Sequence, residues 1–278
     1  MTTDAPAQVG HVSWSQLSSW LKCGKQYELE RIIKAPQTPG VWLAGGSAVH
    51  EWTEIYDTVG LEEAAFAGTW TEVWNKHFTK QASETDVPPT EWRAAGRTTK
   101  DKPNGEDLAW WKVAGLQMCR EYHAWRTGPA AGWTLYDPGV EVDVSALFAG
   151  GVLAKIYLDR LFVMPTGQLV VVDIKTGTKV PDPQQLGWYA AAVERTLGVR
   201  PSLGTYYMAR KGTIEVPFDL DNFTGKYWDH IMGKFVVAKE HEIFLPNPSP
   251  LCRSCSVNTS CYYYSGALAA GVDPLATK

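Results

Sequence analysis

Apolar residues recur at helical spacing in the first half of the chain and in short β-type runs in the second half. Helices are expected over residues 13–23, 45–56, 61–80, 107–127, 182–197 and 221–240. Strands are expected over residues 138–148, 152–164, 168–175, 203–209 and 212–218. A helical N-terminal region is therefore followed by a region in which strands and helices are mixed.

Residues with capping chemistry mark where several of these helices should begin. Ser13 is expected as an N-cap, with Gln16 as its capping-box partner. Gly45-Gly46 is expected to open the second helix. Asp182 is expected as the N-cap of a later helix that has Pro183 at its first position.

Residues 84–106 interrupt the helical pattern with a polar stretch rich in proline and glycine. We predict an irregular, exposed and mobile loop there. Basic residues in this loop and later in the chain are candidate contacts to a nucleic-acid backbone: Arg93, Arg97, Lys100, Lys102, Lys179, Arg210 and Lys211.

The charge balance does not by itself indicate a nucleic-acid partner. The formal net charge of -4 counts modestly against one, although a local groove can be basic on an acidic protein. No apolar run approaches the ~20 residues of a membrane-spanning helix, and the first residues do not combine a basic segment with an apolar one. We therefore expect neither secretion nor membrane insertion, and we expect a cytoplasmic protein.

The candidate chemistry centres on Asp173-Ile174-Lys175, which follows the apolar run Leu169-Val170-Val171-Val172. Asp159 lies fourteen residues earlier in a second apolar run. Two strands joined at Pro165-Thr166-Gly167 would bring both acids to one end of a hairpin, with the lysine beside them. Two carboxylates can hold a hard divalent cation, and a lysine can orient water or stabilise a developing anion. The arrangement therefore suits phosphodiester cleavage.

Whether the two acids meet depends on the turn. A two-residue loop would place Arg160 opposite Asp173 and turn Asp159 away, whereas a three-residue loop pairs Asp159 with Asp173. Gly167 suits the left-handed position of the longer loop, so we predict that loop or an equivalent bulge. A D-x-K tripeptide alone is usually a solvated strand end, and its significance here depends on this hairpin.

Three further residues extend the candidate site. Gln185 and Tyr189 lie four apart on a predicted helix, hence on one face, and both can hydrogen-bond a phosphate or position the lysine. His50 follows Gly45-Gly46 on an amphipathic helix and is a suitable ligand for Mn²⁺. Taken alone, Tyr189 is equally consistent with a half-buried core residue, and a lone histidine there more often has a structural role.

The five cysteines do not fit a disulfide framework, because their number is odd and no secretion signal is seen. Cys252, Cys255 and Cys261 lie within ten residues, and Cys23 is far upstream. Four thiolates can hold either a [4Fe–4S] cluster or a structural Zn²⁺, and spacing alone does not separate the two. Cys119, in a tryptophan-rich helix, is most simply a buried apolar residue.

Together these residues resemble the RecB-like branch of the PD-(D/E)xK nuclease superfamily, over about residues 13–264. The matching segments are Gly46-Ser47-Ala48-Val49-His50, Asp159-Arg160, Asp173-Ile174-Lys175-Thr176-Gly177 and Gln185-Leu186-Gly187-Trp188-Tyr189. The resemblance implies an α/β, restriction-endonuclease-like core, with a mixed central sheet flanked by helices. It implies one nuclease domain over residues 1–264, comprising a helical region (11–133), the core (134–218) and a C-terminal helix with the cysteines (219–264), followed by a tail (265–278).

The resemblance also implies how a divalent metal, Mg²⁺ or Mn²⁺, is bound. In that family the residues matching His50, Asp159 and Asp173 hold the metal, and the backbone carbonyl matching Ile174 often joins them. Glu141 is a weaker match to an additional acid.

Catalytic and DNA-positioning roles follow from the same resemblance. The residue matching Lys175 serves catalysis, and those matching Gln185 and Tyr189 help to position DNA and the lysine. Ala154-Lys155 departs from the family, which often has a small residue such as glycine before the first aspartate.

The cysteine spacing resembles the iron–sulfur nucleases of this branch, which include CRISPR-associated exonucleases and AddB-type helicase–nuclease subunits. The resemblance implies a [4Fe–4S] cluster held by Cys23, Cys252, Cys255 and Cys261. Such a cluster would fasten the N-terminal helix to the C-terminal segment.

We therefore expect an Mg²⁺- or Mn²⁺-dependent deoxyribonuclease, an exonuclease acting on single-stranded DNA ends. The alternative is a non-catalytic DNA-binding or assembly subunit of a recombination or CRISPR-adaptation complex, with a structural zinc or iron–sulfur site. A third interpretation is a zinc-stapled α/β domain with coincidental acids. The simultaneous presence of His50, Asp159, Asp173 and Lys175 favours the enzyme, since a degenerate site usually loses one such residue.

Overall fold

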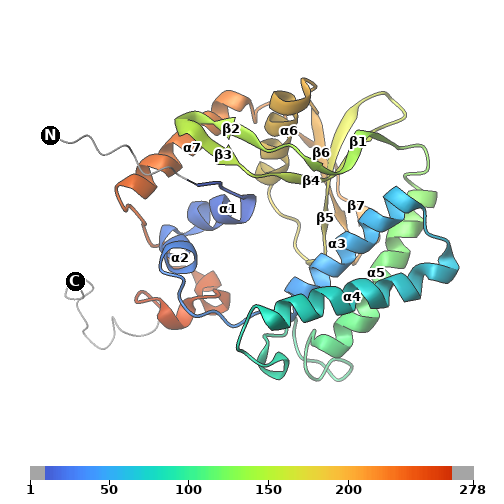
Figure 1. Cartoon of the computed structure of the whole chain (residues 1–278), viewed down its shortest axis with the longest axis horizontal. Coiled ribbons are helices and arrows are strands. Elements are labelled where there is room, and N and C mark those ends of the chain that lie inside the picture. The colour runs from blue at the N-terminus through green and yellow to red at the C-terminus, as the bar shows by residue number, and fades with distance from the viewer. Residues whose placement is uncertain (1–9, 265–278) are drawn as a thin grey trace. The chain divides into compact units, whose positions relative to one another are not determined.

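The computed structural model describes residues 10–264, and its elements are labelled in Figure 1. The helices are α1 (Trp14–Lys22), α2 (Gly24–Tyr27), α3 (Val41–Val59), α4 (Phe66–Ser83), α5 (Leu108–Thr127), α6 (Gln184–Leu197) and α7 (Gly225–Glu240). The strands are β1 (Thr134–Asp143), β2 (Ala146–Phe148), β3 (Val152–Ala154), β4 (Tyr157–Val163), β5 (Leu169–Lys175), β6 (Leu203–Met208), β7 (Thr213–Ile214) and β8 (Phe218–Asp219). Among the described residues, no helix combines the length and apolar character needed to span a bilayer.

The described chain divides into two compact units. One contains residues 38–144 and 157–225, and the other contains residues 10–37, 145–156 and 226–264. The single domain expected over residues 1–264 stays a prediction, and the expected tail, 265–278, lies outside the described residues.

The larger unit is built on a six-stranded mixed sheet. Its strand order is β1-β4-β5-β6-β7, with β8 also pairing with β6. The β5–β6 pair is parallel and the others are antiparallel. Helices α3 to α5 and α6 flank this sheet (Figure 1). The predicted α/β, restriction-endonuclease-like architecture is therefore confirmed.

A tryptophan-rich core joins α3, α4 and α5 to the sheet. Val170, Val172 and Ile174, which alternate along β5, belong to this core together with Trp52 and Trp111. Because side chains alternate along a strand, Asp173 and Lys175 point to the other face. The continuous apolar run of β5 is thus typical of a strand buried on both faces.

Helix α3 corrects one sequence expectation. It begins at Val41, not at Gly45-Gly46. A Cβ atom at Gly45 would overlap the Trp111 ring, so this glycine permits close packing of α3 against α5 and does not start the helix.

Two capping predictions are also wrong. Ser13 is the N-cap of α1 but makes no side-chain cap hydrogen bond, so the capping box with Gln16 does not form. Helix α6 begins at Gln184, and its N-cap residue is Pro183. The Asp182 carboxylate still accepts a 2.9 Å hydrogen bond from the N–H of Gln184, the first residue of α6.

The two long strands expected after residue 134 are each divided. Residues 138–148 contain parts of β1 and β2, and residues 152–164 contain β3 and β4. β1 pairs with β4, whereas β2 pairs with β3 in the smaller unit. The alternation of apolar and polar residues is the same whichever strand is the pairing partner. The sequence pattern therefore did not show where each strand divides.

The loop over residues 84–106 is irregular, as predicted, but it is not exposed throughout. Trp92 is buried, and Glu106 is 5% exposed. Both side chains make specific contacts, since the Trp92 indole donates to the Val87 carbonyl at 2.9 Å and Glu106 binds Arg210.

The smaller unit packs α1 and α2 with the β2–β3 hairpin and α7. Val12 bridges to Ala154 in β3, and the Trp20 ring meets the Phe235 ring of α7 edge-on at 5.4 Å. The Glu30 carboxylate accepts hydrogen bonds from Ser19 and Ser256, which ties the N-terminal helical region to the C-terminal segment of this unit.

Candidate active site

The β4–β5 hairpin brings the two predicted acids together. The Met164 N–H donates to the Gln168 carbonyl at 2.9 Å, and Gly167 has the left-handed φ of 84°. Arg160 is paired with Val172, so the next positions along this antiparallel register, Asp159 and Asp173, lie opposite one another. The predicted three-residue loop is confirmed.

The Asp159 carboxylate connects three elements. Its Oδ2 atom accepts the backbone N–H of Ile174 at 2.7 Å, and its Oδ1 atom lies 3.2 Å from Nδ1 of His50, on α3. Burial disfavours the charged imidazole, but the Asp159 carboxylate outweighs this effect and raises the pKa of His50. Although burial opposes it, the pKa of Asp159 is lowered by His50 and by the Ile174 hydrogen bond.

A second set of contacts fixes the lysine. Lys175 Nζ lies 2.6 Å from Oδ2 of Asp173 and donates to Oε1 of Gln185 at 2.9 Å. The Gln185 amide in turn donates to the Tyr189 hydroxyl at 2.6 Å. Tyr189 is 7% exposed, so its side chain is buried and not half-buried. Helix α6 thus presents the predicted Gln185–Tyr189 face to the end of β5.

Glu141, on β1, joins this group. One donor atom from each of His50, Glu141 and Asp159 lies within 4.8 Å of the others. Sequence reasoning gave Glu141 little weight. The predicted strand contains Pro138-Gly139, and these two residue types indicate an irregular strand. Such an irregularity can change the direction of a nearby side chain.

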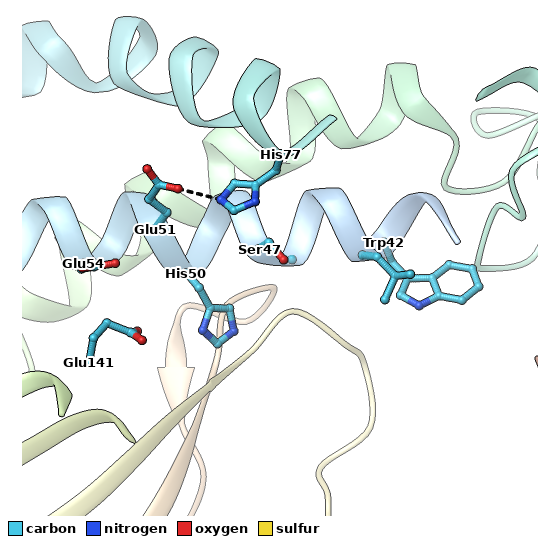
Figure 2. Close-up of a pocket in the computed structure, with 9 residues that line it drawn as sticks. Trp42, Ser47, His50, Glu51, Glu54, His77 and Glu141 are labelled. Atoms are coloured by element: carbon cyan, nitrogen blue, oxygen red, sulfur yellow. Dashed lines mark hydrogen bonds and ion pairs between the residues drawn. The ribbon is translucent and has the colours of Figure 1, made fainter. Parts of the chain in front are cut away.

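A surface pocket of about 520 Å³ opens beside these residues. Figure 2 shows His50 and Glu141 on one side of it, with His77 of α4 directed at Glu51 of α3. The Glu51 carboxylate is bound by His77 at 2.7 Å and by Lys76 at 2.7 Å. The full lining is Trp42, Leu43, Gly46, Ser47, His50, Glu51, Glu54, His77 and Glu141.

The donor set fits a hard divalent cation. An imidazole nitrogen and carboxylate oxygens are ligands that Mn²⁺ and Mg²⁺ accept. Asp173 is 2% exposed, and its Oδ2 atom makes an ion pair with Lys175 but no well-formed hydrogen bond among the described residues. Burial raises the pKa of Asp173 despite Lys175, and the neighbouring Asp159 charge adds to this rise. A bound cation would compensate both buried carboxylates.

Several predicted DNA contacts are engaged within the protein. The Arg210 guanidinium binds both carboxylate oxygens of Glu106, at 2.7 and 2.8 Å, and donates to the Thr176 carbonyl at 2.5 Å. Lys211 pairs with Glu215 at 2.6 Å. Arg210 therefore supports the segment that follows Lys175.

The four predicted cluster cysteines lie in the smaller unit, and none forms a disulfide. Cys23 Sγ accepts the Asn247 N–H and Cys252 Sγ accepts the Ser249 N–H, each at 3.3 Å. Cys255 and Cys261 pack together against a small apolar cluster that includes Val257. Burial raises the pKa of Cys255, and the nearness of Cys261 and Cys23 contributes to this rise. Cys119 is buried in α5, as predicted.

This fold and this cluster of acids and lysine define a nuclease, and the comparison with protein families agrees. The model of the PD-(D/E)XK nuclease superfamily matches residues 11–262, and the chain belongs to this superfamily. Its members use divalent metals, and membership implies that the protein is a nuclease acting on DNA.

Two phage proteins are similar to most of the chain. The Gene 69 protein of Mycobacterium phage D29 is 32% identical over 268 residues, covering 90% of this chain and 95% of that protein. The Gene 69 protein of Mycobacterium phage L5 is 28% identical over 297 residues, covering 93% and 98% respectively.

Proposed function

We propose that this protein is an Mg²⁺- or Mn²⁺-dependent deoxyribonuclease of the RecB-like type that digests single-stranded DNA from its ends. The observation that carries the proposal is the β4–β5 register, which places Asp159 opposite Asp173 and beside the Asp173–Lys175 ion pair. His50 then approaches Asp159 from α3. Four residues suited to metal-assisted hydrolysis thus converge from three elements.

The cation would be held by His50, Asp159 and Asp173, with the Ile174 carbonyl as a further oxygen ligand. When bound, it would lower the pKa of a coordinated water and neutralise charge on the scissile phosphate. The residues present fit this role because Asp159 keeps one carboxylate oxygen directed at His50 while the other is held by the Ile174 N–H.

Lys175 would act on the reacting phosphate. Its ammonium group would orient the attacking water and stabilise the negative charge of the pentacovalent transition state. Gln185 holds the lysine through a direct hydrogen bond, and Tyr189 holds Gln185. This chain would limit the positions of the lysine, and such preorganisation contributes to catalysis.

Trp42 supports the choice of single-stranded DNA as the substrate. Trp42 lines the pocket and lies on α3 eight residues before His50, about 12 Å along the helix at 1.5 Å per residue. An aromatic ring at that separation can stack on a base of a strand whose phosphate lies near His50. The preference for free ends rests on the RecB-like resemblance.

The cysteines would hold a structural [4Fe–4S] cluster. Support comes from four undisulfided thiols in one compact unit and from backbone N–H groups directed at two of the sulfur atoms. Hydrogen bonds from N–H groups to cluster thiolates are a usual feature of such sites. Zn²⁺ held by the same thiolates is the competing occupant.

Digestion of end-labelled linear single-stranded DNA, circular single-stranded DNA and end-labelled linear duplex DNA would test the proposal. With Mn²⁺, the wild type should degrade linear single strands and leave circles intact. Lys175→Ala and Asp173→Ala should each lower the rate at least ~100-fold, whereas Lys112→Ala, which alters an exposed lysine of α5 outside the candidate DNA contacts, should not. Cleavage of circles would indicate an endonuclease. DNA binding without any cleavage would support the non-catalytic alternative.

A further inference from the structure

We propose that Tyr206, on β6, is a positioning residue for Lys175. Its ring supports the lysine ammonium group, and its hydroxyl group holds the segment that leads into Gln185. The inference rests on the proposed function, because Lys175 is the group that Tyr206 positions. It assigns a role to a strand, β6, that supplies none of the proposed metal ligands.

The sheet places Tyr206 beside the lysine. β5 and β6 are parallel, and Asp173 of β5 is paired with Tyr206. Side chains of paired residues project from the same face of a sheet, so Tyr206 shares the face of Asp173 and Lys175. Lys175 Nζ lies over the Tyr206 ring, 5.6 Å from its centroid. This distance is within the ~6 Å at which the face of an aromatic ring attracts an ammonium group.

The surroundings of Tyr206 strengthen this contact and fix the ring. Tyr206 is fully buried and the Lys175 side chain is 26% exposed, so the pair is largely removed from water. A cation–π attraction is stronger when the two groups are desolvated. The Phe218 ring of β8 meets the Tyr206 ring edge-on at 6.1 Å. The face that Tyr206 presents to the lysine is therefore held in one orientation.

The Tyr206 hydroxyl acts at a second point. It donates a 2.7 Å hydrogen bond to the backbone carbonyl of Asp182, just before α6. The Asp182 carboxylate accepts the N–H of Gln184. The next residue, Gln185, binds Lys175 at 2.9 Å. Burial raises the pKa of Tyr206, and neighbouring carboxylates add to this rise, so the hydroxyl keeps the proton that it donates. Tyr206 thus contacts the lysine directly and also anchors the start of the helix that holds it.

Tyr207, the next residue, provides an internal comparison. It is as fully buried as Tyr206, but it projects from the opposite face of the sheet, into the tryptophan-rich core. Its ring lies 4.8 Å from the Trp125 ring, and its hydroxyl has no hydrogen-bond partner among the described residues. Of these two adjacent tyrosines, Tyr206 is therefore the one whose ring and hydroxyl both serve the candidate active site.

The contact with Tyr206 matters most in the metal-bound protein. Lys175 is otherwise held by Asp173 and Gln185. Asp173 is a proposed metal ligand, so its attraction for the lysine would weaken once its charge is shared with a cation. Tyr206 and Gln185 are uncharged and lie outside the proposed ligand set. Their contacts with the lysine would therefore persist while DNA is cleaved.

Mn²⁺-dependent cleavage of linear single-stranded DNA, measured as kcat and KM, tests the inference. Tyr206→Phe keeps the ring and loses the hydroxyl, so kcat should fall about 3- to 10-fold. Tyr206→Leu loses both contacts, and kcat should fall about 30- to 100-fold with KM changed less than about threefold. Tyr207→Phe, the matched control, should stay within about twofold of the wild type. Wild-type kcat in Tyr206→Leu would overturn the inference and leave the proposed nuclease intact.

A double substitution separates positioning from a general loss of packing. Tyr206→Phe acts through the segment that carries Gln185, so it should slow the Gln185→Leu variant less than about twofold. An equal loss in the wild-type and Gln185→Leu backgrounds would show that the hydroxyl does not act through Gln185, and would overturn its positioning role.

Mn²⁺ affinity, measured by calorimetry without DNA, guards against a disturbed fold as the explanation. Tyr206→Phe should bind Mn²⁺ as tightly as the wild type, because none of the proposed ligands changes. A fall in Mn²⁺ affinity that parallels the fall in kcat would assign the effect to the metal site and overturn the inference. A wild type that neither binds Mn²⁺ nor cleaves DNA would overturn the proposed function itself.

Discussion

The Oδ2 atom of Asp159 accepts a 2.7 Å hydrogen bond from the backbone N–H of Ile174, while Oδ1 is directed at His50. One oxygen of this carboxylate therefore holds the β4–β5 hairpin, and the other lies 3.2 Å from the His50 imidazole, where the two groups could bind one cation. The two functions can be separated by substitution. An amide oxygen can still accept the Ile174 N–H, but a neutral amide is a poor ligand for a divalent cation.

Asp159→Asn should accordingly fold and lose activity. The asparagine oxygen can still accept the Ile174 N–H, but the neutral amide is a weaker ligand for Mn²⁺. We expect DNA cleavage to fall at least ~100-fold, with Mn²⁺ affinity reduced ~10-fold or more. Single-turnover cleavage and Mn²⁺ titration measure these effects. Full activity in Asp159→Asn would show that the carboxylate is not a metal ligand.

The Lys175–Gln185–Tyr189 chain predicts graded losses. Gln185→Leu removes the acceptor of the lysine, so kcat should fall about 10- to 100-fold with a smaller change in KM. Tyr189→Phe removes a single hydrogen bond from Gln185 and should cost about 3- to 10-fold. Cleavage rates at saturating Mn²⁺ measure both effects. Gln184→Leu, one residue away, is the control, and equal rates in Gln184→Leu and Gln185→Leu would contradict a positioning role.

The hairpin part of the site was predictable because its determinants are local. The apolar run of β5, the alternation of Asp173 and Lys175, and a glycine suited to a three-residue turn are all readable within about twenty residues of sequence. Together they gave the register that pairs Asp159 with Asp173, and the structure has that register.

Features that depend on packing or on distant pairing were not predictable in this way. The start of α3 was misplaced because Gly45 serves contact with Trp111, which lies 66 residues away in sequence. The approach of Glu141 to Asp159 depends on the register shift in the pairing of β1 with β4. The sequence pattern of each strand alone does not indicate this pairing. Local composition contains neither contact.

Glu106 and Arg210 predict an acid-dependent stability away from the metal ligands. Hydrogen bonds from Arg210 lower the pKa of Glu106 below its ordinary value of 4.5, against the opposing effect of burial. A carboxyl whose folded-state pKa is lowered stabilises the protein above its unfolded pKa, and this contribution is lost as pH falls through the folded pKa.

Glu106→Gln should therefore destabilise the protein most at neutral pH. Because Arg210 also lies over the Trp110 ring at 4.7 Å and would lose its partner charge, we expect a loss of about 2–4 kcal/mol near pH 7. The difference from wild type should shrink on acidification below about pH 4.5. Denaturant unfolding at several pH values measures it. A difference that is independent of pH would refute the ionic contribution.

The proposed [4Fe–4S] cluster predicts a spectroscopic signature that depends on four cysteines. Protein purified without oxygen should be brown, with absorbance near ~400 nm and stoichiometric iron and sulfide. Cys23→Ser or Cys255→Ser should lose this absorbance, because three remaining thiolates leave one cluster corner without its ligand. Cys119→Ser should retain it, since Cys119 is buried in α5.

Loss of the cluster should also lower stability. Cys23 lies beside α1, and the other three proposed ligands lie in the C-terminal segment of the same unit, so the cluster would cross-link distant parts of the chain. Cross-links over long loops stabilise chiefly by restricting the unfolded chain, so Cys23→Ser should melt several degrees lower than the wild type. A colourless wild type containing stoichiometric zinc, destabilised by the same substitution, would instead assign the four thiolates to Zn²⁺. Retention of both colour and stability in Cys23→Ser would remove this residue from the ligand set.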